Sequence, residues 1–336
     1  IAQDPALAAW YATEGNQFID VSLAHEVVRC AAAPFMACPS DGNGNKLSVN
    51  FRQYWMGPAR MGGLQEGRNG NYKMSMGDYA GVITDTQGSA DDRLKESYSR
   101  GAFQTLTETG MSDITDGTSN TAMISERVTG DGVEESDTAG GHIFQRVYCR
   151  DAAVISDGGN TAAFGGARYG GNHVFCPQAL LNVCEGKRYR TNAGGTDTPK
   201  TSGLAGTMWY CGAGAFSWYS HILPPNGPSF VSSRLVGDMS RTCLVPPTSY
   251  HTGGVNVARC DASVAFVTET IDCGNLSGAP LASNPNNTGR SPASPGDYAD
   301  DRETADGRII SGPDSPSNFG VWGAFGSRAG GEAVSP

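Results

Sequence analysis

A cluster of lysine and arginine is what this 336-residue chain most clearly lacks. Only 17% of its residues are charged, and the net charge is −10. Proteins that bind nucleic acid neutralise phosphates with clustered basic side chains, and polybasic segments are what attract anionic lipid. We therefore expect no nucleic-acid partner and no docking on an anionic membrane surface.

Long apolar runs and close cysteine pairs are also missing. No stretch approaches the roughly 18–20 apolar residues of a membrane helix, and no secretory signal peptide is visible, so we expect no membrane span in this chain and a natural N-terminus that was removed or not included. No C-x-x-C pair occurs, which speaks against a zinc ribbon. The nine cysteines are therefore expected to form disulfides in an oxidising, extracellular compartment, with one left over. The disulfide candidates are Cys30, Cys38, Cys149, Cys176, Cys184, Cys211, Cys243, Cys260 and Cys273.

Glycine and short apolar runs dominate what is present. The chain holds 46 Gly and 18 Pro, a composition typical of a loop-rich, strand-dominated protein. Helix is favoured only near the start, over 4–18 and 22–35. We expect a single domain over 1–336, with a disulfide-stapled insertion at 130–212, where Gly and Asn are frequent, and a long surface loop at 283–317.

The segment HTGGVNVARCDASVAFVTETID, residues 251–272, predicts a β-hairpin. Apolar residues alternate with others on both sides of a four-residue break at 260–263, which is the pattern of two antiparallel strands. We expect the strands to cover 254–259 and 264–268, with Val257 and Phe266 on a buried face.

His251 and Asp261 lie at opposite ends of the first of these strands. Nine intervening residues, even partly extended at roughly 3.3 Å each, would separate the two side chains by about 25–30 Å. They cannot share a proton or a metal ion within one chain. We therefore interpret the pair as structural.

Five segments of the chain, in order, resemble a planctomycete-type family of secreted, pilin-like proteins that is catalogued as a domain of unknown function. Precursors in that family begin with a prepilin cleavage and methylation segment. The hairpin resembles the family's His-x9-Asp-Gly signature, and the other segments resemble its Cys-Pro-Ser-Asp, Asp-Gly-Thr-Ser-Asn-Thr, Leu-Pro-Pro-Asn and Gly-Gly-Glu motifs. The segments are FMACPSD (35–41), ITDGTSNTAMISE (114–126), ILPPNGPS (222–229), SYHTGGVNVARCDASVAFVTETID (249–272) and GVWGAFGSRAGGEAVS (320–335).

The resemblance implies an α+β, pilin-like head with an antiparallel sheet. It implies a structural subunit of a filament or assembly, made of copies of itself, that is extracellular or at the cell surface, and no enzyme. The chain departs from the family pattern at Ala262, where the family has Gly, and the prepilin helix with its Phe-Thr-Leu-Ile-Glu motif is not in this chain. The structural motif residues carried over are His251, Gly254, Asp261, Asp116, Gly117, Asn120 and Glu332.

Calcium is one ligand that the residues leave open. The block DITDGTSNT places the oxygen-bearing side chains of Asp113 and Asp116 close together in sequence, and calcium prefers such ligands. The alternative is an Asp-Gly turn whose side chains bond to nearby backbone. The spacing is not that of an EF-hand.

The residues also leave zinc and glycans open as ligands. A zinc site could be formed by His173, Cys176 and Cys184. The alternative is that the two cysteines form disulfides. The aromatic stretch 205–222 could stack on sugars in a monomeric extracellular glycan-binding or polymer-binding module, or simply pack in the core. No G-x-S-x-G elbow and no Rossmann or P-loop glycine pattern occurs, so nothing indicates an enzyme.

Overall fold

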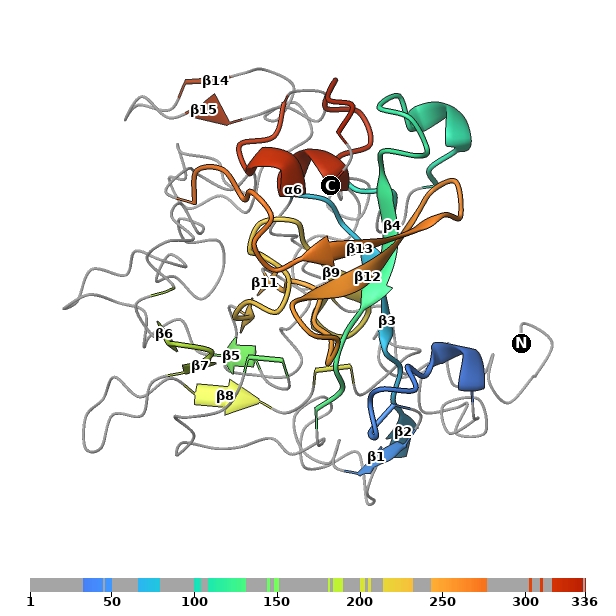
Figure 1. Ribbon diagram of the computed structural model, residues 1–336, viewed down its shortest axis with the longest axis vertical. Coiled ribbons are helices and arrows are strands. Elements are labelled where there is room, and N and C mark those ends of the chain that lie inside the picture. Colours follow the sequence, from blue (N-terminus) through green and yellow to red (C-terminus); the bar gives the residue numbers. More distant parts are fainter. Residues whose placement is uncertain are drawn as a thin grey trace, which may run out of the picture.

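The structure is a computed structural model that describes part of the chain. The described residues are 33–44, 46–49, 66–78, 100–103, 108–130, 144–145, 148–150, 181, 184–189, 200–202, 205–206, 214–231, 243–276, 302–303, 309–310, 316–334 and 336. They form short strands and few helical turns, an α+β arrangement (Figure 1). The helices predicted over 4–18 and 22–35 lie outside the described residues, except for residues 33–35 at the end of the second one. There the structure has a 3₁₀ turn, Pro34–Met36.

The helical elements are η1 (Pro34–Met36), η2 (Met111–Asp113), α5 (Gly214–Ser217) and α6 (Gly320–Gly326). The strands are β1 (Leu47–Val49), β2 (Glu66–Arg68), β3 (Tyr72–Ser75), β4 (Ala122–Glu126), β5 (Tyr148–Arg150), β6 (Cys184–Glu185), β7 (Arg188–Tyr189), β8 (Lys200–Ser202), β9 (Trp218–Tyr219), β10 (Phe230–Val231), β11 (Cys243–Leu244), β12 (Gly254–Arg259), β13 (Val264–Thr268), β14 (Arg302–Glu303) and β15 (Ile309–Ile310).

A five-stranded sheet in the order β13-β12-β4-β3-β9 forms the centre of the described structure. Its strands pair antiparallel except β3 and β9, which run parallel. A four-stranded sheet, β11-β10-β5-β8, also contains one parallel pair, between β10 and β5. The expectation of an antiparallel sheet is therefore correct for most pairs and wrong for these two.

The predicted hairpin is confirmed, with strands β12 and β13 at the bounds expected from the sequence. Its predicted facing is wrong for Phe266. Val255 lies opposite Val267, whereas Phe266 lies opposite Asn256. Because side chains alternate between the faces of a strand, Phe266 points away from the core and is 48% exposed.

The surrounding backbone constrains two positions of the hairpin, Ala262 and Gly254. Ala262 has φ = 67° in the tight turn, which lies in the left-handed region that glycine adopts without strain. A Cβ atom at Gly254 would overlap the carbonyl oxygen of Val267 and would lie 2.9 Å from the ring of Phe266. Glycine is therefore required at 254 by the close approach of the second strand.

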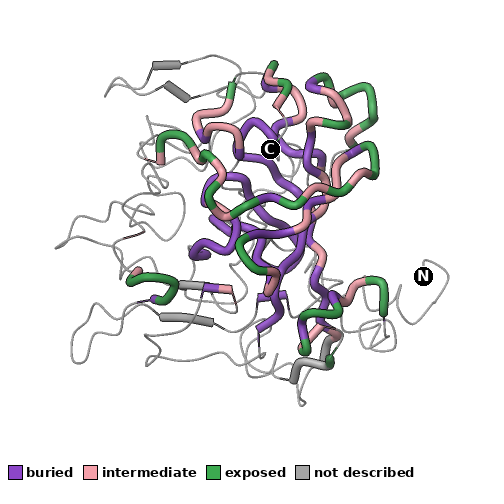
Figure 2. Tube along the Cα trace, in the orientation of Figure 1, coloured by how far each residue is buried: buried purple, intermediate pink, exposed green. Residues whose placement is uncertain are grey.

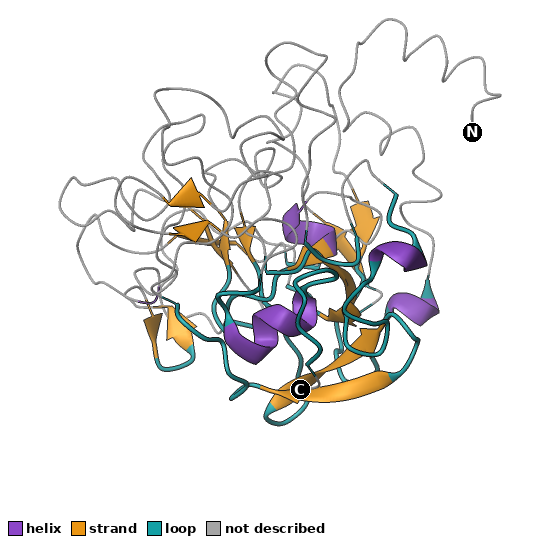
Figure 3. Cartoon of the chain, turned by 90° about the horizontal axis from the view of Figure 1, so that it is seen from above, coloured by secondary structure: helices purple, strands orange, loops and turns teal. Residues whose placement is uncertain are grey.

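The main core lies between the sheet and α6. Its fully buried members include Trp322 and Phe325, which are three residues apart and so share one face of the helix. Figure 2 shows the buried residues gathered in the centre, and Figure 3 shows α6 beside the long strands of the hairpin. The cluster is Ala122, Tyr219, Val255, Val257, Val267, Trp322 and Phe325.

The region 130–212 is described only in part, so its predicted role as an insertion is not tested. Strands β5 and β8 belong to the four-stranded sheet, and β6 pairs with β7 in a small hairpin. Lys187 in its turn forms an ion pair with Glu269 just after β13, with 2.6 Å between Nζ and Oε1. None of the described helices is long and apolar enough to cross a membrane.

The prediction that most cysteines form disulfides is wrong for three of the candidates. Cys38, Cys260 and Cys273 are free thiols. The Sγ of Cys38 lies 2.9 Å from Ser40 Oγ, and the Cys273 thiol donates to the carbonyl of Ile271. The thiols are held in separate local environments. Cys184 is half-buried in β6, and the side chains of Cys30, Cys149, Cys176, Cys211 and Cys243 lie outside the described residues.

Candidate functional site

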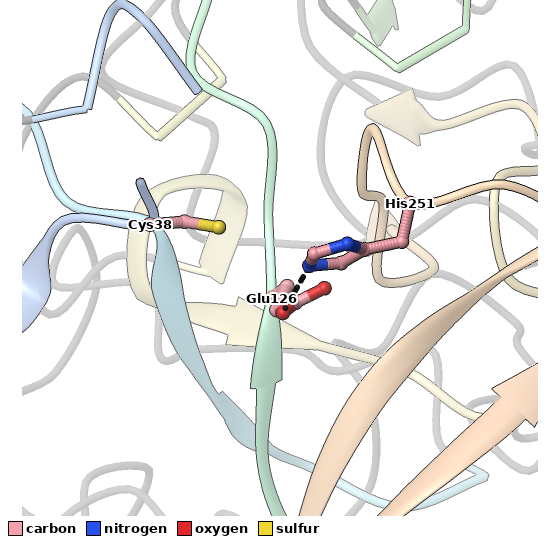
Figure 4. Close-up of side chains that lie close together, drawn as sticks. All are labelled: Cys38, Glu126 and His251. Carbon is pink, nitrogen blue, oxygen red and sulfur yellow. Dashed lines mark hydrogen bonds and ion pairs between the residues drawn. The ribbon is translucent and has the colours of Figure 1, made fainter. Parts of the chain in front are cut away.

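Three side chains from distant parts of the sequence meet at one end of the central sheet. They are Cys38 from the loop after η1, Glu126 at the end of β4, and His251 before β12 (Figure 4). One sulfur, one carboxylate oxygen and one imidazole nitrogen all lie within 4.8 Å of one another. Among the residues that the structure describes, they form the one such group of three potential metal ligands.

The loop that carries Cys38 is fixed by a buried network of hydrogen bonds. The Cys38 backbone N–H donates to Asn71 Oδ1 (2.8 Å), and Asn71 Nδ2 donates to Asp41 Oδ2 (2.6 Å) and to the carbonyl of Arg127. Asp41 Oδ2 also accepts from the backbone N–H and the hydroxyl of Thr129. Cysteine and aspartate of the Cys-Pro-Ser-Asp segment are thereby held against the start of β3 and the residues after β4.

Glu126 is buried, and its carboxylate is held by β12. Its Oε1 accepts from Asn256 Nδ2 (2.9 Å), and its Oε2 accepts from the Asn256 backbone N–H (3.3 Å). Its carbonyl accepts from the N–H of Thr248 in the segment that leads to His251. A carboxylate bonded on both oxygens has a fixed orientation, which here directs it toward the ring of His251.

His251 reaches the site through a loop that the Leu-Pro-Pro-Asn segment supports. Asn226, at φ = 61°, accepts from the Ser249 backbone N–H through Oδ1 (2.8 Å), and Ser249 Oγ accepts from the His251 N–H (2.9 Å). The Nε2 atom of His251 then lies 3.2 Å from Glu126 Oε1. The imidazole is 37% exposed, so the cluster is open to solvent on its side.

Tyr72 adds a fourth polar side chain to this neighbourhood. It lies directly opposite Glu126 in the pairing of β3 with β4. Partial burial raises the pKa of the Tyr72 phenol, and negative charge at Cys38 and then at Glu126 raises it further. The phenol therefore stays protonated and is a hydrogen-bond donor next to two groups that can carry negative charge.

The arrangement is convergent and does not form a relay. In a catalytic relay of cysteine, histidine and carboxylate, one ring nitrogen faces the thiol and the other faces the carboxylate. Here a single nitrogen of His251 lies within 4.8 Å of both the sulfur and the carboxylate oxygen. A ring that presents one nitrogen to both groups cannot pass a proton between them through its other nitrogen.

The predicted Asp-Gly-Thr-Ser-Asn-Thr block forms a turn that binds the Gly-Gly-Glu segment. Asp116 accepts through Oδ2 from the Gly330 N–H (2.8 Å) and through Oδ1 from the Gly331 N–H (2.9 Å). Gly117 has φ = 97°, and Asn120 Nδ2 donates to the carbonyl of Asp116 (3.0 Å). The block therefore acts as a clamp on a segment more than 200 residues further along.

The predicted calcium ligands are engaged in backbone contacts. Asp113 is exposed and its Oδ2 accepts from the Gly110 N–H (2.7 Å), while both carboxylate oxygens of Asp116 accept from the glycines of the clamp. These are side-chain-to-backbone bonds of the kind that the turn interpretation expects, and the calcium site stays a prediction. Glu332 accepts from the Ser317 N–H through Oε2 (2.7 Å), so it too holds the chain together.

Asp261 and the aromatic stretch also have structural roles where they are described. Asp261 accepts from the Ser263 backbone N–H and hydroxyl across the hairpin turn and lies at the opposite end of β12 from His251, as predicted. Hydrogen bonds from Ser263 lower the pKa of its exposed carboxyl. Trp218 and Tyr219 are buried, so neither is a platform for stacking on a sugar. His173 and Cys176 lie outside the described residues.

A second histidine, His221, is buried at the junction of β9 and α6. Its ring lies 4.0 Å from that of Trp322, centroid to centroid. Nδ1 faces the Trp322 carbonyl (3.1 Å) and Nε2 faces Ser75 Oγ (3.1 Å). Because a carbonyl only accepts, Nδ1 carries the proton and Nε2 accepts from the serine hydroxyl. Burial lowers the pKa of His221 to about 3, so the imidazole is neutral.

The sequence contains each segment of the candidate site but does not indicate that the three residues meet. The sequence predicts Cys38 as a disulfide candidate, weighs His251 only with Asp261, and places Glu126 at the end of the block considered for calcium. One signal was available: a thiol, a carboxylate and an imidazole each belong to a segment that resembles the same family.

Comparison with known proteins identifies the family. No curated protein and no solved structure matches the chain. The family described as "Protein of unknown function (DUF1559)", SBP_bac_10, matches residues 5–274. That match covers four of the five segments quoted above and all three residues of the candidate site. The chain therefore belongs to the DUF1559 family.

Proposed function

We propose that the protein is a structural subunit that assembles with copies of itself, at or beyond the cell surface, and that it is not an enzyme. Membership of the DUF1559 family, together with the pilin-like character that the motif resemblance implies, supports this role. The motif residues also support it, because Asp116, Asp261 and Glu332 serve to hold chain segments together.

The observation that carries the proposal is the composition of strand β13. Among the described residues, β13 lies at the edge of the five-stranded sheet with β12 as its one strand neighbour. Its sequence, VAFVT, contains no charge, no proline and no glycine. Monomeric proteins protect an edge strand with lysine, proline or a bulge, because an unprotected edge pairs with strands of other chains.

The exposed side chains of β13 fit contact with a second copy. Val264 and Phe266 are 65% and 48% exposed and point to the same face. A net charge of −10 makes identical chains repel, so contacts between copies must use uncharged surface and leave carboxylates at the rim. Two β13 edges that pair with each other close a dimer, and a filament needs a second, head-to-tail contact.

Light scattering and electron microscopy of the full chain test the proposal. We expect particles larger than the 35.1 kDa monomer at high protein concentration. Val264→Lys should reduce assembly because it places a charge on the edge strand. Thr270→Lys is the matched control, since it adds the same charge at an exposed position beyond the strand. A monomer at high concentration without fibres, or equal assembly of both variants, would contradict the proposal.

The runner-up, a monomeric module that binds glycans, loses part of its support. The described aromatic residues of the stretch 205–222 are in the core: Phe216, Trp218 and Tyr219. Trp209 and Tyr210 lie outside the described residues. The free thiols of Cys38, Cys260 and Cys273 also remove part of the argument for an oxidising compartment. The extracellular assignment therefore rests on the resemblance of the five motif segments.

A further inference from the structure

We propose that Cys38, Glu126 and His251 bind one divalent transition-metal ion, and that zinc is the ion whose preferences they fit best. The site is independent of self-assembly. It would join the loop after η1, the end of β4 and the segment before β12, three parts of the chain that are far apart in sequence.

The donor set points to zinc. Zinc binds thiolate sulfur, imidazole nitrogen and carboxylate oxygen, and three protein ligands with one open position are a common arrangement. Calcium and magnesium select sites built from oxygen, so a thiolate and an imidazole argue against them. The convergent geometry agrees, because one nitrogen of His251 faces both the sulfur and the carboxylate.

The distances require little movement for a metal to bind. Zinc–ligand bonds of roughly 2.0–2.3 Å in a tetrahedron place the ligand atoms about 3.3–3.6 Å apart. Nε2 of His251 and Oε1 of Glu126 are already 3.2 Å apart, and all three ligand atoms lie within 4.8 Å of one another. Rotation of the Cys38 side chain and small shifts of the other two suffice to close the set.

Neighbouring groups hold the ligands as the outer shell of a metal site does. Asn256 donates to both oxygens of Glu126, through its side chain and its backbone N–H. Ser40 Oγ lies 2.9 Å from the sulfur of Cys38. Such partners orient ligands, and their loss typically lowers metal affinity by roughly 10- to 100-fold.

Two of the ligands are buried and the third is partly exposed to solvent. Cys38 and Glu126 are 8% and 5% exposed, so two ligands are shielded from water. His251 is 37% exposed and leaves an approach from solvent. A metal ion that enters on this side keeps its fourth position for water.

Cobalt and zinc titrations of the reduced, metal-stripped full chain test the proposal. Cobalt stands in for zinc and gives a thiolate-to-cobalt charge-transfer band when a cysteine binds it. We expect one equivalent of cobalt to produce the band and zinc to displace it. Cys38→Ser should abolish the band. Cys260→Ser is the matched control, because Cys260 is a free thiol of similar burial, 6% exposed, outside the cluster, and should keep the band.

Two further variants keep the test decisive if Cys38→Ser does not fold. His251→Asn changes a half-exposed side chain, so the fold should persist by circular dichroism while the affinity for zinc falls. Asn256→Ala should lower zinc affinity by roughly 10- to 100-fold and leave the band in place. A band retained in Cys38→Ser, unchanged affinity in His251→Asn, or a disulfide at Cys38 in unreduced peptide maps would overturn the proposal.

Discussion

Acidification should destabilise the protein through His221, because the folded state holds this imidazole without a proton. Its folded pKa is lowered to about 3 by burial, whereas an unfolded chain leaves it at its ordinary value of 6.5. Below that ordinary value the unfolded state binds a proton that the folded state excludes. The stability contributed by neutral His221 is therefore complete above about pH 6.5 and is lost as the pH falls toward the folded pKa.

The size of the effect follows from the separation of the two pKa values. Each pH unit between them changes the free energy of unfolding by about 1.4 kcal/mol. Between about pH 7 and pH 4 the loss from His221 alone should reach about 3 kcal/mol. The free energy of unfolding of a typical domain is only about 5–15 kcal/mol, so this loss is a large part of it.

Urea denaturation at a series of pH values, followed by tryptophan fluorescence, measures the effect. The comparison is with His221→Phe, which keeps a ring against Trp322 and binds no proton. Other titrating groups are common to both proteins, so the difference in unfolding free energy isolates His221. We expect the advantage of the natural protein to shrink by about 3 kcal/mol over this range. A difference that stays constant with pH, or an NMR titration of His221 near 6.5, would refute the reasoning.

Three substitutions test other parts of the fold by urea denaturation. Ala262→Gly should stabilise the protein by about 1 kcal/mol, since φ = 67° strains alanine and not glycine, and a loss of stability would show that the turn differs. Asp116→Asn should cost about 1–3 kcal/mol and make the segment after α6 more sensitive to protease, because one oxygen cannot serve the N–H groups of both Gly330 and Gly331; unchanged stability would exclude the clamp. Phe266→Ala should cost only about 1 kcal/mol, because the ring is 48% exposed; a loss near 4 kcal/mol would mean that it is buried.

The sequence predicted the hairpin but could not choose its buried face. Alternation and the break at 260–263 define two antiparallel strands. In β13, however, Ala265 and Val267 are apolar as well as Val264 and Phe266, so period two fits either face. The turn decides the register, and the turn depends on the left-handed backbone of Ala262.

The candidate site was beyond prediction for a different reason. No two of its residues are local neighbours, and His251 and Glu126 are 125 positions apart. Their meeting depends on β12 pairing with β4 and on the loop after η1 being held by Asn71. Composition and spacing give no information on such pairings. The same holds for the free thiols, because a count of cysteines does not reveal which of them lie near another.

The strand order of the central sheet also determines how this protein must fold. Within this sheet a short turn joins only β12 (Gly254–Arg259) to β13 (Val264–Thr268), so only that hairpin can form locally, on a timescale of roughly microseconds. The pairs β3–β4, β4–β12 and β3–β9 each close a loop of many tens of residues before they gain any contact. The core is then completed by Trp322 and Phe325, which follow all five strands. The hairpin therefore cannot complete its packing until nearly the whole chain is present. Before α6 packs against it, its apolar face is exposed to chaperones, to proteases and to other copies of the protein.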